Sequence, residues 1–174
     1  VNIMPMAGLG KRFINSSYKL PKPLIKINNK PMFLQAYRSM PKSYKNIFIC
    51  NKTLVDKFKI KKIFIKELKN KFKLIKVNKI TKGQASSCIK AEKYLNNQEM
   101  IFVHSCDSLI KYDKFKFVKA MQDVDALILT TKPNKTHLSK IKSYGWVSIR
   151  NNKIKNISCK KKASNMPSKD RVII

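Results

Sequence analysis

The sequence lacks several features that would assign it at once to a class of protein. Its 174 residues contain no apolar run approaching the ~20 residues of a membrane span, and no signal-peptide pattern opens them. The four cysteines are widely spaced without a C-x-x-C pair, which favours reduced thiols in a cytoplasmic protein. No internal repeat occurs. What is left is a globular chain, 43% apolar, which we expect to form a single domain over residues 1–174.

Acidic residues and arginine are also scarce. Nine Asp and Glu stand against 39 Lys and Arg, giving a formal net charge of +30. Only four of the basic residues are arginine, and the lysines are spread over the whole length, so the clustered arginines of a nucleic-acid-binding module are missing. Asn and Ile are abundant together with Lys, and this combination favours the bias that an AT-rich coding sequence produces. The alternative is a surface selected to bind polyanions. Whichever origin the charge has, it should cause non-specific adsorption to nucleic acid.

Strand and helix patterns alternate through the first three quarters of the chain. Short segments rich in β-branched or aromatic residues predict strands at 2–6, 46–51, 73–78, 100–104 and 126–131. The segments between them predict helices at 31–40, 54–71, 84–96 and 113–122. This alternation is typical of an α/β fold with a mostly parallel central sheet and helices on both faces.

The last quarter of the chain has a different pattern. Residues 144–149 and 154–158 read as the two strands of a β-hairpin that turns at Asn151-Asn152. Residues 160–170 are polar and predict a loop. The apolar tail, 171–174, predicts the start of another strand, so we expect the chain to be an N-terminal fragment of a longer protein.

The first strand leads into a glycine-bracketed turn followed by cations. The run is Ala7-Gly8-Leu9-Gly10-Lys11-Arg12. Such a turn presents backbone N–H groups to an anion, and Lys22, held between two prolines, adds a third cation. The dinucleotide fingerprint is not met, because Phe13 stands at its third glycine position. A plain strand-to-helix turn is the alternative, but the cations favour a cradle for a triphosphate.

Two more motifs follow the ends of predicted strands. Asp107 comes after the 100–104 strand, where a carboxylate can hold Mg²⁺ against phosphate oxygens, although it can also cap a turn. Gly83 and Gln84 open a helix after the third strand. There the glycine permits close approach of a flat ligand, and the amide can read a base edge. A helix start without a ligand is the alternative for this pair.

Other reactive side chains lack partners that would make a catalytic site. His104 and His137 show no Ser-His-Asp order and no metal-ligand spacing, so we interpret both as structural. Cys106 has no basic neighbour in sequence and is interpreted as a packing residue. Trp146 is interpreted as hairpin packing, with the border of an acceptor pocket as the alternative.

Taken together, these segments resemble the sugar-phosphate nucleotidyltransferases, whose fold is Rossmann-type and similar to that of GT-A enzymes. The family signature, A-G-x-G-x-R followed by P-K-P and by K-P-M or K-P-L, matches residues 7–12, 21–23 and 30–32. The family's G-x-A helix start matches residues 83–85, its metal aspartate matches Asp107, and its Y-G hairpin matches residues 144–145. The resemblance covers nearly the whole chain.

The resemblance implies nucleotidyl transfer from an NTP to a sugar phosphate or similar phosphorylated acceptor, with Mg²⁺ as cofactor. It implies catalytic roles for Arg12, Lys22 and Asp107, with Asp107 also the metal ligand. It implies nucleotide binding by Ala7, Gly8, Leu9, Gly10, Lys11, Gly83 and Gln84. It places the acceptor beside Gly145 and Lys160. Neither a specific nucleic acid nor a membrane is an implied partner, and a homo-oligomer stays open.

The chain departs from the family pattern in two places. The Glu-Lys pair that many members carry after the hairpin reads Cys159-Lys160 here, so only the lysine corresponds. The second metal aspartate would lie beyond residue 174. A cytidylyltransferase of an amino-alcohol phosphate is one alternative. A GT-A glycosyltransferase is another, although its D-x-D pattern occurs only at residues 123–125, before a predicted strand.

Overall fold

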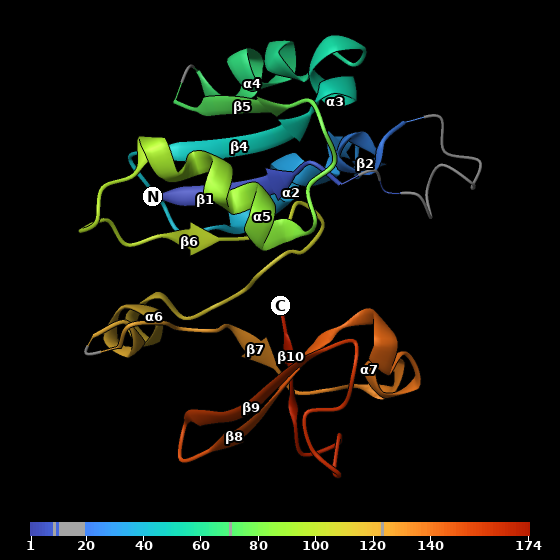
Figure 1. Ribbon diagram of the computed structural model, residues 1–174, viewed down its shortest axis with the longest axis vertical. Helices are drawn as coiled ribbons and strands as arrows, with labels where there is room; N and C mark the ends of the chain where they lie inside the picture. The colour runs from blue at the N-terminus through green and yellow to red at the C-terminus, as the bar shows by residue number, and fades with distance from the viewer. Residues whose placement is uncertain (9, 11–19, 70, 123) are drawn as a thin grey trace. The chain divides into compact units, whose positions relative to one another are not determined.

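The computed structural model describes residues 1–8, 10, 20–69, 71–122 and 124–174 (Figure 1). These residues form two compact units, Val1–Lys111 and Tyr112–Ile174, and each is described by itself. The prediction of a single domain over residues 1–174 is not tested by this division and stays a prediction. None of the described helices has both the length and the apolar character that a membrane crossing requires.

The first unit is built on a four-stranded parallel sheet. Its strands, in spatial order, are β5 (Lys73–Val77), β4 (Asn46–Asn51), β1 (Asn2–Met6) and β6 (Phe102–Val103). Each neighbouring pair runs parallel. The predicted strands at 2–6 and 46–51 are confirmed to the residue. The edge strands are shorter than predicted, since 73–78 ends one residue early and only two residues of 100–104 pair with β1.

Helices cover both faces of this sheet. Even-numbered side chains of β1, such as Met4 and Met6, pack with Phe33 of α2 (Met32–Ser39) and Phe64 of α4 (Ile60–Leu68). Odd-numbered ones, such as Ile3, pack on the other face with residues of α5 (Gln84–Cys88) and η2 (Ile89–Tyr94), which Figure 1 shows in front of the sheet. Because successive strand side chains alternate, an apolar run can fill two cores at once. The predicted α/β arrangement is confirmed.

The predicted helix at 54–71 is instead two helices, α3 (Lys52–Asp56) and α4, separated by Lys59 in the left-handed region at φ 49°. On one straight helix, Leu54 would point about 120° away from Ile60 and about 80° away from Phe64, at 100° per residue. The break allows Leu54, Ile60 and Phe64, all at most 1% exposed, to enter the same core. Burial thus overrides helix continuity here.

Two smaller features of the first unit differ from the prediction. The helix predicted at 84–96 changes from α to 3₁₀ geometry at Ile89 and ends at Tyr94. A short hairpin, β2 (Lys26–Ile27) and β3 (Lys30–Pro31), turns at Asn28 and Asn29 with positive φ and was not predicted. It leads from the 3₁₀ turn η1 (Lys22–Leu24) into α2, so it fixes the chain around Lys22.

The second unit holds an antiparallel sheet. Its strands, in spatial order, are β7 (Thr130–Thr131), β10 (Arg171–Ile173), β8 (Gly145–Arg150) and β9 (Lys153–Cys159). The helical segments are α6 (Lys114–Ala120), α7 (Lys135–Ser139) and η3 (Ile141–Ser143). The predicted hairpin is confirmed, because Asn151 and Asn152 both adopt the positive φ of a type I′ turn. The predicted C-terminal strand is also confirmed, while the strand predicted at 126–131 is reduced to two residues.

Candidate functional site

A cavity of about 270 Å³ opens at the carboxyl end of β1, where an open parallel sheet binds its ligands. It brings together residues from four stretches of the first unit. The lining residues are Pro5, Met6, Ala7, Gly8, Gly10, Lys22, Pro23, Thr81, Gly83, Gln84, Ser87, Cys106 and Asp107. Every residue of the described chain that was predicted to bind nucleotide or to act in catalysis therefore lies at this cavity. Leu9, Lys11 and Arg12 lie outside the described residues.

The glycine turn forms one wall. Gly10 has φ +60°, a conformation that L side chains rarely adopt, and an added Cβ would lie 3.4 Å from Lys22 Cβ. At Gly8 an added Cβ would meet nothing within 4 Å, so the turn borders open space there. A backbone free of side chains beside an open cavity is suited to close approach of an anion.

Asn51, the last residue of β4, connects this turn to the sheet. Its Oδ1 accepts a hydrogen bond from Leu54 N (2.9 Å), capping α3. Its Nδ2 donates to the carbonyls of Ala7 (3.4 Å) and Gly8 (3.3 Å). One side chain therefore fixes both a helix start and the first residues of the glycine turn. Asn51 was not predicted as a site residue, because its link to Gly8 spans 43 residues of sequence.

Lys22 and Asp107 meet at the cavity. The Lys22 ammonium donates a hydrogen bond to Asp107 Oδ2, and the pair bridges 85 residues of sequence. Pro23 is buried and η1 holds Lys22 at its first position, so the backbone around the lysine is fixed by packing. The two side chains keep 24% and 33% of their exposure, which leaves the pair accessible from solvent.

The charge on Asp107 is favoured by its neighbours. Burial acts to raise the pKa of the Asp107 carboxyl, but hydrogen bonding and charge from Lys22, with a hydrogen bond from Ser105, bring that pKa below its ordinary value. Asp107 is therefore an anion at neutral pH. A single partly exposed carboxylate fits Mg²⁺, which takes one or two protein carboxylates and completes its shell with phosphate oxygens and water. Among the described residues no group of three His, Cys, Asp or Glu converges.

Another part of the cavity lining is the segment from Thr81 to Gln84, which is held by hydrogen bonds from hydroxyl groups. The Gly83 carbonyl accepts from Ser87 N (3.1 Å), from Ser87 Oγ (3.2 Å) and from Thr81 Oγ1 (3.3 Å). The two hydroxyls also contact each other at 2.6 Å. An added Cβ at Gly83 would meet nothing within 4 Å, so this glycine too faces open space. Thr81 and Ser87 were missed as site residues, although both lie within three residues of the predicted pair Gly83 and Gln84.

The remaining reactive side chains near the cavity, Cys106 and His104, are buried and uncharged. Burial, together with the nearby Asp107 charge, raises the pKa of the Cys106 thiol to about 12, so it is not a nucleophile at neutral pH. His104 is 3% exposed and its Nε2 donates to the Ser108 carbonyl (2.8 Å). Burial lowers the pKa of His104 although Ser108 and Asp107 oppose the shift, so its ring is neutral.

The two predicted acceptor residues lie in the second unit, at one end of the β8–β9 hairpin. Gly145 pairs with Cys159, and Lys160 N donates to the Tyr144 carbonyl (2.9 Å), so the structure places Gly145 and Lys160 close together. An added Cβ on Gly145 would lie 3.0 Å from Ile173 Cδ1, so the Ile173 side chain of β10 would have to shift to admit it. Trp146 is fully buried and its Nε1 donates to the Ile141 carbonyl (3.0 Å), which is the predicted packing role.

Solved structures share this fold. The inositol-1-phosphate CTP transferase from T. maritima aligns over 99% of this chain and 67% of its own, with TM-score 0.76 and 15% identity. A nucleoside-diphosphate-sugar pyrophosphorylase from Vibrio cholerae RC9 aligns over 99% and 72%, with TM-score 0.74 and 15% identity. The UTP-bound UGPase from Acinetobacter baumannii aligns over 99% and 71%, with TM-score 0.67 and 17% identity.

The sequence itself was compared with families and with individual proteins. No curated protein sequence gives a significant match. The model of the nucleotidyl transferase family, in contrast, matches residues 2–166. This match includes the glycine turn, Lys22, the Gly83 turn, Asp107 and the hairpin. Because the match spans nearly its whole length, the chain belongs to the nucleotidyl transferase family.

Proposed function

We propose that the protein transfers a nucleotidyl group from an NTP to the phosphate of a sugar phosphate, or of a similar phosphorylated acceptor, and releases pyrophosphate. The observation that carries this proposal is the contact between Lys22 and Asp107 at the cavity below the Gly8 turn. A metal-bound triphosphate needs a cation for its oxygens and a carboxylate for its metal, and this wall offers both.

The proposed reaction is an in-line displacement. An acceptor phosphate oxygen attacks the α-phosphorus, the bond to the bridging oxygen breaks, and pyrophosphate leaves. The N–H groups of the Ala7–Gly10 turn, with Leu9 between the glycines, face the β- and γ-phosphates, and Lys11 and Arg12 neutralise their charge. Lys22 bridges the α-phosphate and the acceptor. The attacking oxygen is already an anion, so no side chain has to remove a proton, and catalysis rests on positioning and charge.

Asp107 is the residue that would hold Mg²⁺, which the family resemblance implies as cofactor. When bound, the ion offsets the negative charge that develops on the phosphates. With Asp107 on the metal, the Lys22 ammonium would be available to phosphate oxygens. In this proposal the ion pair of the ligand-free protein keeps the Lys22 ammonium and the Asp107 carboxylate at the cavity, and binding of the substrate would separate them.

The base and the acceptor are read by two different parts of the chain in this proposal. Gln84 carries an amide at the cavity wall, beside the open space above Gly83, and offers a donor and an acceptor to a base edge. Lys160 supplies a cation for the acceptor phosphate, next to Gly145. The T. maritima neighbour is named for a phosphorylated cyclic alcohol rather than a sugar phosphate, so an alcohol phosphate is a second candidate acceptor.

A pyrophosphate-release screen tests the proposal. Each of the four NTPs is combined with sugar 1-phosphates, amino-alcohol phosphates and inositol phosphate, with Mg²⁺ present. We expect release above the acceptor-free blank for one NTP and one acceptor class. Calorimetry with each NTP and Mg²⁺ tests the nucleotide site separately. If none of the four NTPs binds in that measurement, the proposal is wrong.

A substitution at Asn51 separates positioning of the glycine turn from helix capping. Asn51→Ser keeps a side-chain oxygen able to cap α3 but removes the amide that donates to Ala7 and Gly8. Losing these two long hydrogen bonds should cost about 0.5–1.5 kcal/mol of NTP binding, a loss of about twofold to tenfold in affinity. The melting temperature should stay near that of the wild type. Calorimetry and thermal denaturation measure the two effects.

Asn51→Ala is the matched control, since it removes the cap as well. It should lower the free energy of unfolding by about 1 kcal/mol in addition to weakening NTP binding. If Asn51→Ser restores both stability and affinity relative to Asn51→Ala, the side chain acts only as a helix cap.

A further inference from the structure

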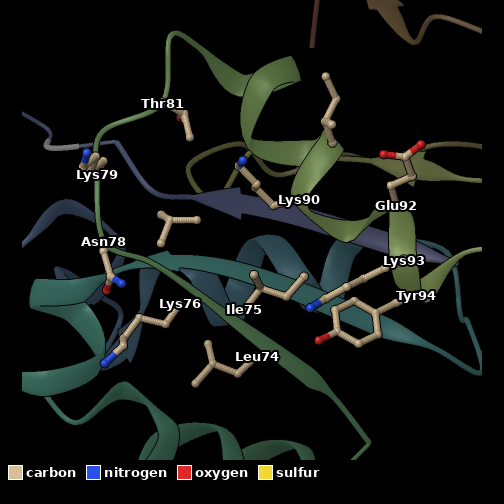
Figure 2. A pocket seen from close by; sticks show the side chains of 12 residues that line it. Leu74, Ile75, Lys76, Asn78, Lys79, Thr81, Lys90, Glu92, Lys93 and Tyr94 are labelled. Atoms are coloured by element: carbon tan, nitrogen blue, oxygen red, sulfur yellow. The ribbon is translucent and has the colours of Figure 1, made fainter.

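A second hollow, of about 710 Å³, lies on the first unit beside the edge strand β5 (Figure 2). One side is β5 and the segment that follows it, and the other is η2. The lining residues are Leu74, Ile75, Lys76, Val77, Asn78, Lys79, Thr81, Ile89, Lys90, Glu92, Lys93 and Tyr94. Apart from Thr81, none of them lines the nucleotide cavity, so the proposed nucleotidyl transfer does not use this hollow.

Lysine side chains make the hollow positively charged. Lys90 and Lys93 are three residues apart on the 3₁₀ helix η2 and therefore lie on the same side of it. Figure 2 shows the Lys93 side chain extending toward Ile75 of β5, and the Lys90 side chain extending toward the segment that carries Lys79. Lys76 turns away and pairs with Asp56 (3.3 Å), and the Glu92 carboxylate points away from the lysines. Like charges held on one side of a short helix repel each other, and an anion between them relieves that repulsion.

Apolar side chains form part of the lining of the hollow. Ile75 and Val77 of β5 and Ile89 of η2 contribute to it, and Ile89 is 64% exposed. Apolar walls lower the local dielectric response, so an anion beside these ammonium groups is bound more strongly than at an open surface. A cavity of this size, with mixed apolar and cationic walls, is in the range that accommodates a small organic molecule.

We propose that this hollow is a second binding site, for a small phosphorylated molecule with at least two negative charges. Lys79, Lys90 and Lys93 would hold the charged groups, and Ile75 and Val77 would contact the body of the ligand. Single-stranded nucleic acid fits less well, because it needs open aromatic faces for its bases. Tyr94 is the aromatic residue of the lining, and ammonium groups already approach its ring, Lys73 at 4.4 Å and Lys93 at 5.2 Å from the centroid.

Amide resonances can distinguish a ligand in the second site from a ligand in the nucleotide cavity, and Thr81 lies where the two sites meet. Its side chain lines both cavities and contacts Ser87 Oγ, so it belongs to the wall between them. A ligand in the hollow should therefore shift the amide resonances of residues 74–79 and 89–94, and Thr81, which the two cavities share, should respond as well. Binding at the nucleotide cavity should shift Gly8, Gly10 and Asp107 instead.

The probe is tripolyphosphate, followed by residue-resolved amide NMR and calorimetry. We expect two saturable sets of shifts. In Lys90→Gln/Lys93→Gln the set at residues 74–79 and 89–94 should weaken at least about tenfold, because charge-assisted hydrogen bonds are lost. Lys22→Ala should weaken the other set and leave this one unchanged. Both lysines of η2 are exposed, so the double variant should melt as the wild type does.

Lys61→Gln/Lys62→Gln on α4 is the matched control, since it removes the same charge from another exposed helix face. It should leave both sets unchanged. Equal weakening by the two double variants, or shifts that do not saturate, would show diffuse attraction to a basic surface and overturn the proposal. Tighter binding of an eight-nucleotide single strand than of tripolyphosphate at the same amides would also overturn it. If the proposed nucleotide site does not exist, the amide shifts at Gly8 and Asp107 will be absent, and this result is distinguishable from the absence of shifts at the second hollow.

Discussion

Lys22→Ala should reduce the rate of pyrophosphate release and weaken NTP binding by far more than it disturbs the fold. Removing a charge-assisted contact to phosphate costs about 1.5–3 kcal/mol, which corresponds to a loss of roughly tenfold to a hundredfold. The ion pair with Asp107 keeps 24% and 33% exposure on its two sides, and exposed pairs contribute at most about 1 kcal/mol to folding. Initial rates, calorimetry with NTP and Mg²⁺, and thermal denaturation measure the three effects.

The matched control for this experiment is Lys26→Ala. Lys26 is an exposed lysine of the same segment, on β2, and does not line the cavity. Its removal takes away the same charge four residues further along, so it should leave rate and affinity near those of the wild type. Equal losses of rate and affinity in Lys22→Ala and Lys26→Ala would mean that the overall positive charge of the protein attracts the triphosphate, without a specific contact from Lys22. An unchanged rate in Lys22→Ala would remove Lys22 from the site.

The sequence indicates the fold well where the signal is local. The strands at 2–6 and 46–51 follow from short apolar runs, and the Asn151-Asn152 turn follows from the preference of asparagine for positive φ. The same reasoning applied at Asn28-Asn29 would have found the β2–β3 hairpin, which has the same kind of turn. That hairpin was missed because its strands are two residues long and carry no alternating pattern.

Tertiary contacts decide the features that local patterns do not show. The chain breaks its helix at Lys59 because Leu54, Ile60 and Phe64 are buried in one core, and a lysine in the left-handed region gives no sequence signal. The sequence contains Lys22 and Asp107 as separate motifs, and only the parallel order of β1 and β6 brings them together. Asn51 was missed for the same reason, since its partners Ala7 and Gly8 directly follow the neighbouring strand β1.

Asp107→Asn should abolish the Mg²⁺ dependence of NTP affinity while leaving the ligand-free protein folded. The substitution keeps the size and hydrogen bonding of the side chain and removes its charge, which is what a hard cation binds. NTP affinity is measured by calorimetry across a series of Mg²⁺ concentrations. Mn²⁺ serves as a second probe, because its paramagnetic broadening of the Ser105 and Asp107 amides reports the metal without any turnover. Broadening should occur in the wild type and be lost in the variant.

Stability gives a further, independent check on the charge of Asp107. Lys22 helps to hold the pKa of the Asp107 carboxyl below its unfolded value of about 3.9, so the ionised form stabilises the fold above that pH. The advantage of the wild type over Asp107→Asn is lost as pH falls through the lowered pKa of the folded state. It should be no more than about 1 kcal/mol at neutral pH, because the pair is partly exposed.

The pattern of results separates a metal ligand from a turn cap. If Asp107 only caps the turn at residues 105–108, Asn should replace it freely, since both side chains cap well. Mg²⁺ would then raise NTP affinity equally in wild type and variant, and Mn²⁺ would broaden the same amides in both. Identical metal dependence in the two proteins would therefore contradict the metal site. Loss of metal dependence with an unchanged melting temperature at neutral pH requires that the carboxylate acts on the metal-bound triphosphate.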